Sequence, residues 1–247
     1  MTGTTGYGQR AAYYAAEISR VPGPALLTGL LRPGMAVAEM PSGTGHFLPA
    51  YSAAGARITL VDACPQMLAA GQALATRSGT TVTAVCETIE DLPGRAGPFD
   101  VIVMPNGAVN QLAAWTPLAR VLAIVARLLA PDGLFLAQIL APDAACGFYD
   151  PGLRDGDWHL DRHFTSGDGQ AVTRRRCQHH RDGLVHIDFE LASGGNPVHR
   201  QLVTLRPMPV REAAAALADA GMRGLRTSPG HGGLAEVLGA RQSRNPQ

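Results

Sequence analysis

Short apolar runs alternate with helical stretches over the first 140 residues of the chain. Five runs are apolar without a regular polar alternation, and they cover residues 35–40, 57–61, 81–86, 99–104 and 134–140. Such runs are typical of strands that are buried on both faces of a parallel sheet. Helical stretches lie before and between them, at residues 9–19, 25–31, 46–54, 65–77 and 116–129. The alternation predicts an α/β fold with an open, doubly wound, Rossmann-like sheet.

The pattern changes after Leu140. Residues 141–170 are rich in Gly, Asp, His and Pro, which predicts an irregular loop. Three alternating segments then predict an antiparallel insertion, at residues 171–180, 184–192 and 199–206. A helix over 209–220 and a hairpin from 222–227 and 235–241 are expected to complete the sheet.

We expect one domain over residues 1–247. Its expected parts are an N-terminal helical lid (1–33), a core (34–140), an insertion on the substrate side (141–206) and a C-terminal helix with a hairpin (207–247).

Composition narrows the class of protein. The net charge is only +1, so a general nucleic-acid binder is disfavoured. All 21 basic residues are arginines. No apolar run reaches 18 residues, and the polar N-terminus lacks an apolar segment, so neither a membrane span nor a secretory signal is expected. The four cysteines are scattered without a CxxC pair, which indicates reduced thiols and a cytoplasmic protein.

A glycine-rich loop carries the strongest chemical signal. Residues 39–46, Glu-Met-Pro-Ser-Gly-Thr-Gly-His, join the first predicted strand to the next helix. Small residues there let a cofactor approach the backbone. Asp62 ends the second strand, where a carboxylate can accept hydrogen bonds from a ribose diol. A dinucleotide fingerprint would need Gly or Ala where Leu48 stands, which disfavours a nicotinamide oxidoreductase.

With these residues the chain resembles class I methyltransferases that depend on S-adenosylmethionine (SAM). The resemblance covers residues 9–242 in architecture, and it departs from the family pattern where Pro41 replaces the usual first glycine. It implies SAM as the cofactor and S-adenosylhomocysteine (SAH) as the product. The cofactor-binding residues that it implies are Glu39, Met40, Ser42, Gly43, Gly45, Asp62, Ala63, Met67, Glu87, Thr88 and Met104.

The segment after the fourth strand, residues 99–112, resembles the part of the family that lines the methyl-transfer site. Together with the insertion, it is similar to small-molecule methyltransferases of bacterial secondary metabolism, including sugar-amine N-methyltransferases. Some of those enzymes carry a histidine where Gln111 stands, and an amide cannot act as a base near neutral pH. Candidate catalytic residues are Asn110, Gln111 and His231, without a strong base being required.

Candidate acceptor contacts come from several segments. They are Tyr13 and Tyr14 of the N-terminal helix, Asn106 after the fourth strand, and Trp158 and His159 in the expected loop. A metal site at His159, Asp161 and His163 lacks a further ligand pattern, so no metal is expected. Trp115 is expected to pack on the helix over 116–129, and the arginines at 174–176 are expected on a solvated or interface strand.

The sequence therefore predicts an enzyme that transfers the methyl group of SAM to an amine or hydroxyl of a small metabolite, in natural-product biosynthesis. Two alternatives stay open: a SAM-binding protein without methyl transfer, either a cyclase or an inactive subunit, and a nicotinamide-dependent oxidoreductase. The expected partner is the small-molecule acceptor, with neither a membrane nor a nucleic acid, and a homodimer is allowed.

Overall fold

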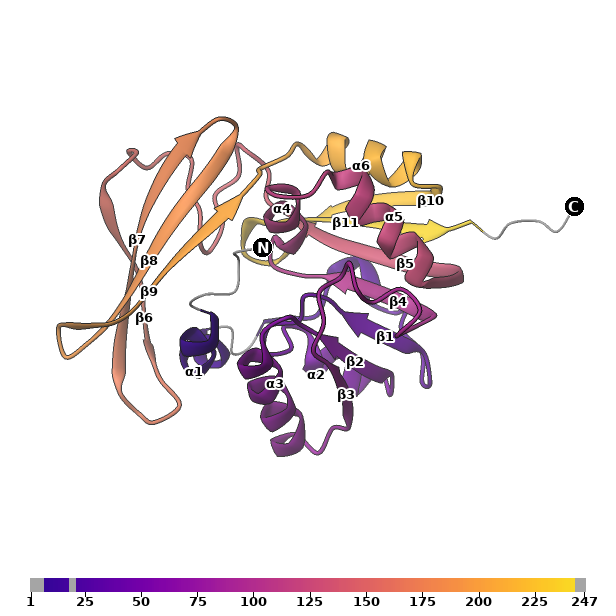
Figure 1. Ribbon diagram of the computed structural model, residues 1–247, viewed down its shortest axis with the longest axis horizontal. Helices are drawn as coiled ribbons and strands as arrows, with labels where there is room; N and C mark the ends of the chain where they lie inside the picture. The colour runs from indigo at the N-terminus through magenta and orange to yellow at the C-terminus, as the bar shows by residue number, and fades with distance from the viewer. Residues whose placement is uncertain (1–6, 18–20, 243–247) are drawn as a thin grey trace, which may run out of the picture.

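A computed structural model describes residues 7–17 and 21–242. Its main sheet has seven strands in the order β10-β11-β5-β4-β1-β2-β3 (Figure 1). The bounds are β1 Ala36–Glu39, β2 Arg57–Val61, β3 Val82–Val85, β4 Phe99–Met104, β5 Leu129–Ile139, β10 Met222–Pro229 and β11 Ala235–Arg241. Strands β1 to β5 pair in parallel, and β11 runs antiparallel to both of its neighbours. The doubly wound sheet and its closing hairpin are therefore confirmed.

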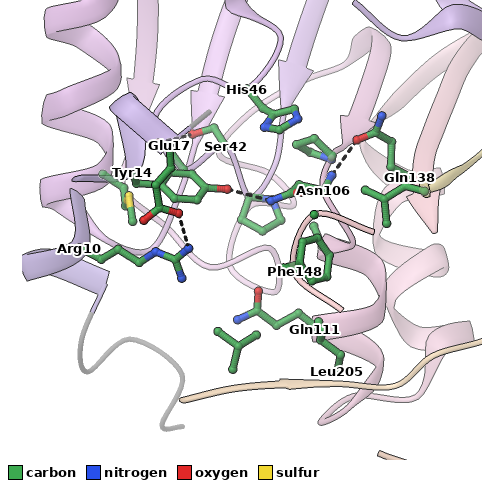
Figure 2. A pocket seen from close by; sticks show the side chains of 18 of the residues that line it. Arg10, Tyr14, Glu17, Ser42, His46, Asn106, Gln111, Gln138, Phe148 and Leu205 are labelled. Atoms are coloured by element: carbon green, nitrogen blue, oxygen red, sulfur yellow. Dashed lines mark hydrogen bonds and ion pairs between the residues drawn. The ribbon is translucent and has the colours of Figure 1, made fainter. Parts of the chain in front are cut away.

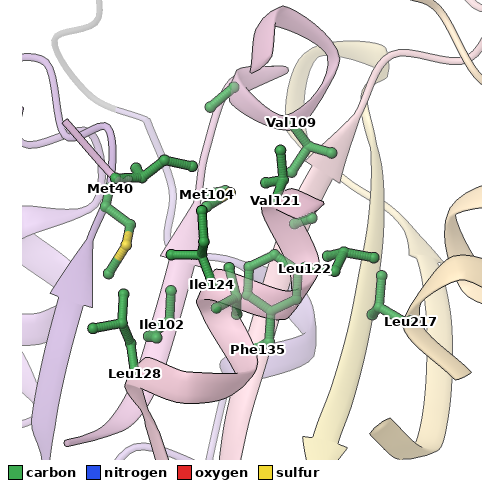
Figure 3. Close-up of a cluster of buried hydrophobic side chains, with 14 of the residues drawn as sticks. Met40, Ile102, Met104, Val109, Val121, Leu122, Ile124, Leu128, Phe135 and Leu217 are labelled. Atoms are coloured by element: carbon green, nitrogen blue, oxygen red, sulfur yellow. The ribbon is translucent and has the colours of Figure 1, made fainter. Parts of the chain in front are cut away.

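Helices cover both faces of this sheet. One face packs against η1 Ala25–Leu27, α2 Leu48–Ala53 and α3 Pro65–Arg77. The other packs against α4 Ala108–Ala113, α5 Leu118–Leu128 and α6 Val210–Asp219. Figure 3 shows the second cluster, where α5 and α6 pack over the buried side chains of β4 and β5. Burial on both faces explains why these strands have continuous apolar runs.

A second, antiparallel sheet stands apart from the first. It contains β6 Trp158–Thr165, β7 Ala171–Arg181, β8 Leu184–Ser193 and β9 Asn196–Leu205, in that order. The expected insertion is confirmed, but the expected loop over 141–170 is wrong for β6. The apolar side chains of Trp158 and Leu160 are exposed, and a register shift follows Leu160, so the usual alternation is hidden.

Helix α1, Tyr7–Glu17, lies between this second sheet and α3 (Figure 1). It contacts β6 and β9 on one side and α3 on the other. A short 3-10 turn, η2 His231–Gly233, lies between β10 and β11. In the part of the chain that the structure describes, no helix is long and apolar enough to cross a membrane.

Candidate functional site

One pocket of about 550 Å³ lies where the carboxyl ends of β1, β2 and β4 face the second sheet. The glycine loop and the residues after β2 and β4 form one part of its wall. Helix α1, the loop around Phe148, and β6 to β9 form the rest. Figure 2 shows side chains from these distant segments around the same space. Parallel strands bring their carboxyl ends to one edge, which is where such sheets bind ligands.

The glycine loop is braced by Asp62. The Gly43 amide donates to Asp62 Oδ2 at 2.7 Å, and the Cys64 amide donates to Oδ1 at 2.9 Å. Burial raises the pKa of Asp62, although both amide hydrogen bonds oppose that rise. Gly43 has a φ of +53°, and a Cβ added there would lie 3.0 Å from the Tyr14 ring. A side chain at this position would therefore meet both backbone strain and a close contact.

Glu39 supports the loop from behind. Its side chain is fully buried, and it accepts hydrogen bonds from the His46 amide, the Phe47 amide at 3.0 Å and the Tyr51 hydroxyl at 2.8 Å. Burial raises the pKa of Glu39 to about 7 against these three donors. The carboxylate fixes the turn into α2, so the predicted direct contact with the cofactor is replaced by a supporting role.

The predicted cofactor residues divide into two groups. Those that line the pocket are Ser42, Gly43, Asp62, Ala63 and Met67. The others do not line it: Met40 and Met104 are buried in the core (Figure 3), Gly45 packs near Leu48 and Leu60, Glu87 pairs with Arg95, and Thr88 bonds Asp91. Their predicted contacts with the cofactor stay predictions.

Polar side chains line the segment after β4. Asn106 donates through Nδ2 to the Tyr14 hydroxyl at 3.0 Å, and its backbone amide donates to Gln138 Oε1 at 2.9 Å. Asn106 has a φ of +52°. Gln111 and His231 also line the pocket, with His231 exposed at its rim. Tyr14, Asn106, Gln111 and His231 thus lie where the sequence predicts them.

Asn110 does not belong to this group. It is fully buried, and its amide joins three main-chain groups: it donates to the carbonyls of Leu140 and Arg206 and accepts from the Leu140 amide. These bonds fix α4 against the end of β5 and the residue after β9. The predicted catalytic role is therefore corrected to a structural one.

Three other candidates also lie outside the pocket lining. Tyr13 is half-buried on α1 and does not line the cavity. Trp158 is exposed and stacks under the Arg175 guanidinium at 5.5 Å. His159 follows it on β6 and does not reach the cavity. Their predicted contacts with the acceptor stay predictions.

Two further expectations concern the surroundings of the pocket. Asp161 bonds Arg174 and His163 bonds Thr173, so two of the three considered metal ligands are engaged elsewhere. Trp115 is exposed at the pocket wall rather than packed on α5.

Sequence reasoning missed His46. This residue follows the glycine loop and lines the pocket, and its Nδ1 atom is buried without a hydrogen-bond partner. Burial, with a further contribution from His231, lowers the pKa of His46 to about 4. His46 is therefore neutral at physiological pH. Its position directly after Gly45, the last small residue of the loop, was the available signal.

Sequence reasoning also missed a buried ionic network. Glu17 Oε2 accepts from Arg10 at 2.9 Å and from Arg174 at 2.7 Å, and Arg174 Nε donates to Asp161 at 2.6 Å. Arg174 and Arg176 are buried, and Arg175 between them is exposed. Of the expected solvated or interface strand, the solvated alternative is wrong for the two buried arginines: Arg174 pairs with Glu17 of α1 and Asp161 of β6, and Arg176 pairs with Asp161.

The residues present fit SAM. The Asp62 carboxylate lines the pocket, where a ribose diol can reach it. A Cβ atom at Gly43 would occupy the space between the loop and Tyr14. Met67 and Ala63 offer apolar surface next to Asp62. One carboxylate acceptor beside apolar surface suits the ribose and the base of a nucleoside.

Comparisons with known proteins agree with this geometry. Residues 37–133 match the family model described as a methyltransferase domain. A comparison with curated proteins finds no match. The structure of the CcbJ methyltransferase from Streptomyces caelestis is similar with a TM-score of 0.75 and 18% identity, over 97% of this chain and 99% of that one.

Two sugar enzymes are also similar. The sugar N-methyltransferase KedS8 from Streptoalloteichus gives a TM-score of 0.65 at 21% identity, covering 96% of this chain and 91% of that one. CalS10 from Micromonospora echinaspora, an amino pentose methyltransferase described with SAM bound, gives 0.62 at 18% identity over 96% and 92%.

The fold is that of class I methyltransferases, and residues 37–133 match the model of a methyltransferase domain. The resemblance predicted from the glycine loop and Asp62 is confirmed. The matched domain and the fold support a SAM-dependent methyltransferase.

Proposed function

We propose that this methyltransferase acts on an amine or hydroxyl of a small metabolite in natural-product biosynthesis. The observation that carries the proposal is a single pocket with two chemically different parts. The Gly43–Asp62 part fits the cofactor, and the part around Asn106 and Gln111 offers amides to an acceptor. A cavity of about 550 Å³, covered by the second sheet, suits a small molecule rather than a polymer.

Within this proposal, five residues hold the cofactor: Ser42, Gly43, Asp62, Ala63 and Met67. Bound SAM supplies a methyl group on a sulfonium, which is already a good leaving group. The chain therefore has to align the acceptor with that methyl and exclude water. Tyr14 and Asn106, joined by a hydrogen bond, lie beside Gly43 and are placed to position the acceptor.

Proton handling requires little from the protein. Gln111 and Asn106 can orient an acceptor N–H or O–H, but amides do not take up a proton near neutral pH. An amine that binds without its proton needs no base before transfer. The proton released afterwards can leave at the rim, where His231 is exposed. Phe148 and Leu205 line the same region and limit the entry of water.

The choice of an amine is supported by two structural relatives. KedS8 is described as a sugar N-methyltransferase, and CalS10 as an amino pentose methyltransferase involved in calicheamicin biosynthesis. The four unpaired cysteines support action in a reducing, cytoplasmic compartment. We also propose that residues 1–247 act as one unit, since α1 and the second sheet both contribute to the pocket.

The test is an assay with a defined acceptor panel. The protein is incubated with SAM and with paired small molecules, amino sugars and their hydroxyl analogues, and SAH and methylated products are measured by mass spectrometry. We expect the native chain to form SAH with an amino compound, and the Asp62→Asn variant to form it more slowly at the same SAM concentration. SAM binding without turnover on any acceptor would favour the alternative of a SAM-binding protein without methyl transfer.

A further inference from the structure

We propose that Arg162, backed by Arg174, forms a subsite for an anionic group of the methyl acceptor, a carboxylate or a phosphate. This inference rests on the proposed function, because it assumes that the acceptor occupies the part of the pocket beside the second sheet. It adds a property of the acceptor that neither the fold nor the comparisons provide.

The wall beside the second sheet holds more cations than anions. The charged side chains gathered there are the cations Arg10, Arg162, Arg174 and Arg176 and the acids Glu17 and Asp161. Both acids already pair with arginines: Glu17 Oε2 accepts from Arg10 and Arg174, and Asp161 accepts from Arg174, while Glu17 Oε1 is buried without a hydrogen-bond partner. Positive charge therefore remains on this wall.

Arg162 carries that excess into the pocket. It donates to two main-chain carbonyls, Glu17 O at 3.2 Å and Gly147 O at 2.8 Å. Among residues 7–17 and 21–242, no carboxylate forms an ion pair with it. Partial burial lowers the pKa of Arg162, and the neighbouring Arg174 and Arg10 lower it further, while Asp161 and Glu17 oppose the change. An anion in the pocket would supply the missing counter-charge.

His199 lies close to Arg10 and Glu17 of this wall. It is buried on β9 near this wall, and neither ring nitrogen has a hydrogen-bond partner. Burial lowers the pKa of His199, and Arg10 lowers it further, while Glu17 opposes the change.

The surrounding shape suits an acceptor with an apolar or ring body attached to the anion. Phe189 lines the cavity and is flanked by the guanidinium groups of Arg10 at 5.0 Å and Arg174 at 4.9 Å. Phe148 and Leu205 add apolar surface. A guanidinium presents a planar fork that matches carboxylate and phosphate oxygens, so the same arginine can bind either anion.

The experiment uses inorganic phosphate and acetate as probes. SAH-loaded protein with ¹⁵N-labelled arginine is titrated with each anion at constant ionic strength in chloride, and the side-chain Nε–H signals are followed by NMR. Three variants are compared with the native chain: Arg162→Gln, the charge-preserving Arg162→Lys, and Arg175→Gln as the control. Arg175 is exposed on the neighbouring strand and does not line the pocket.

We expect saturable binding of at least one anion in the native chain, seen at the Arg162 signal. Binding should weaken at least tenfold in Arg162→Gln and be retained in Arg175→Gln, with Arg162→Lys weakened less. The tighter of phosphate and acetate then identifies the acceptor's acidic group. No saturable shift at Arg162, or equal binding by Arg162→Gln, would overturn the subsite.

Two controls keep this result separate from the proposed function. SAH affinity is measured on the same samples, so intact SAH binding without anion binding rejects the subsite alone. A native chain that binds neither SAM nor SAH rejects the proposed function instead. If Arg162→Gln does not fold, the native titration decides, because the shift must appear at Arg162 and not at Arg175.

Discussion

Several buried polar side chains of this protein act on the backbone rather than on a ligand. Glu39 and Asn110 were predicted to contact the cofactor and the acceptor, yet each binds main-chain groups of neighbouring segments. Loop and strand ends leave amides and carbonyls unpaired, and a buried carboxylate or amide can satisfy two or three of them at once. Sequence shows that a polar residue lies near the site, but not whether it faces the cavity.

Asn110→Ala should therefore damage stability more than chemistry. The substitution leaves the Leu140 amide and the carbonyls of Leu140 and Arg206 without their partner. Each buried group left unpaired costs about 1–3 kcal/mol. Denaturant unfolding should show this loss, while SAM affinity at low temperature stays close to the native value. Native stability combined with lost turnover would instead restore Asn110 as a catalytic residue.

His46 should remain neutral across the physiological range, because its pKa is lowered to about 4 by burial. NMR of its ring protons should show no titration step near the ordinary value of about 6.5. On acidification the unfolded chain binds a proton at this histidine before the folded chain does. The free energy of unfolding is therefore unaffected by His46 above pH ~6.5 and falls as the pH drops toward 4.

Two titratable groups lie near His46 and are present in every variant of this test. They are His231 across the pocket and Glu39 behind the loop, which accepts a hydrogen bond from the His46 amide. In His46→Asn the fall in stability between pH 6.5 and 4 should shrink. A His46 titration midpoint near 6.5 would contradict the buried, unpartnered geometry.

At the scale of elements, local patterns predict the parallel core well. The expected bounds of β2, α3 and β4 match the structure at both ends: Arg57–Val61, Pro65–Arg77 and Phe99–Met104. These elements are fixed by burial on both faces and by a proline at the start of α3. The pattern failed for β6, where apolar side chains point outward, and for Arg174, whose burial depends on α1 from a distant part of the chain.

The glycine loop offers a matched pair of substitutions. Gly43 and Gly79 both have positive φ, +53° and +65°, but only at Gly43 would a Cβ meet another atom, Tyr14 Cε1 at 3.0 Å. Gly43→Ala should weaken SAM binding at least tenfold, because Tyr14 or the loop must move. Gly79→Ala carries the same backbone strain and should leave SAM affinity unchanged in calorimetry. Equal effects on affinity would show that the contact with Tyr14 is irrelevant.

At the scale of the whole molecule, α1 joins the two sheets. Its Glu17 is buried and pairs with Arg174 of the second sheet, and its Tyr14 bonds Asn106 at the end of β4. Arg10 and Arg174 outweigh burial and lower the pKa of Glu17, so this carboxylate is ionised. The pocket therefore depends on a helix that is distant in sequence from most of its other walls.

Glu17→Gln should strongly destabilise the protein. The substitution removes the carboxylate that the buried Arg10 and Arg174 share, although Arg174 also pairs with Asp161. Breaking a buried pair typically costs about 3–5 kcal/mol. Glu212→Gln is the control, because its pair with Arg206 is partly exposed and should contribute at most about 1 kcal/mol. Chemical denaturation followed by circular dichroism separates the two. A Glu17→Gln variant as stable as Glu212→Gln would argue against this bridge.

Binding of SAM tests the central claim most directly. Isothermal titration calorimetry on the native chain, Asp62→Ala and Asp62→Asn should show one SAM per native chain, and no heat with NADH. Each charged hydrogen bond from the ribose is worth roughly 1.5–3 kcal/mol, so Asp62→Ala should lower SAM affinity about tenfold or more. SAM affinity unchanged in Asp62→Ala, or micromolar binding of NADH, would contradict the assignment of this pocket to SAM.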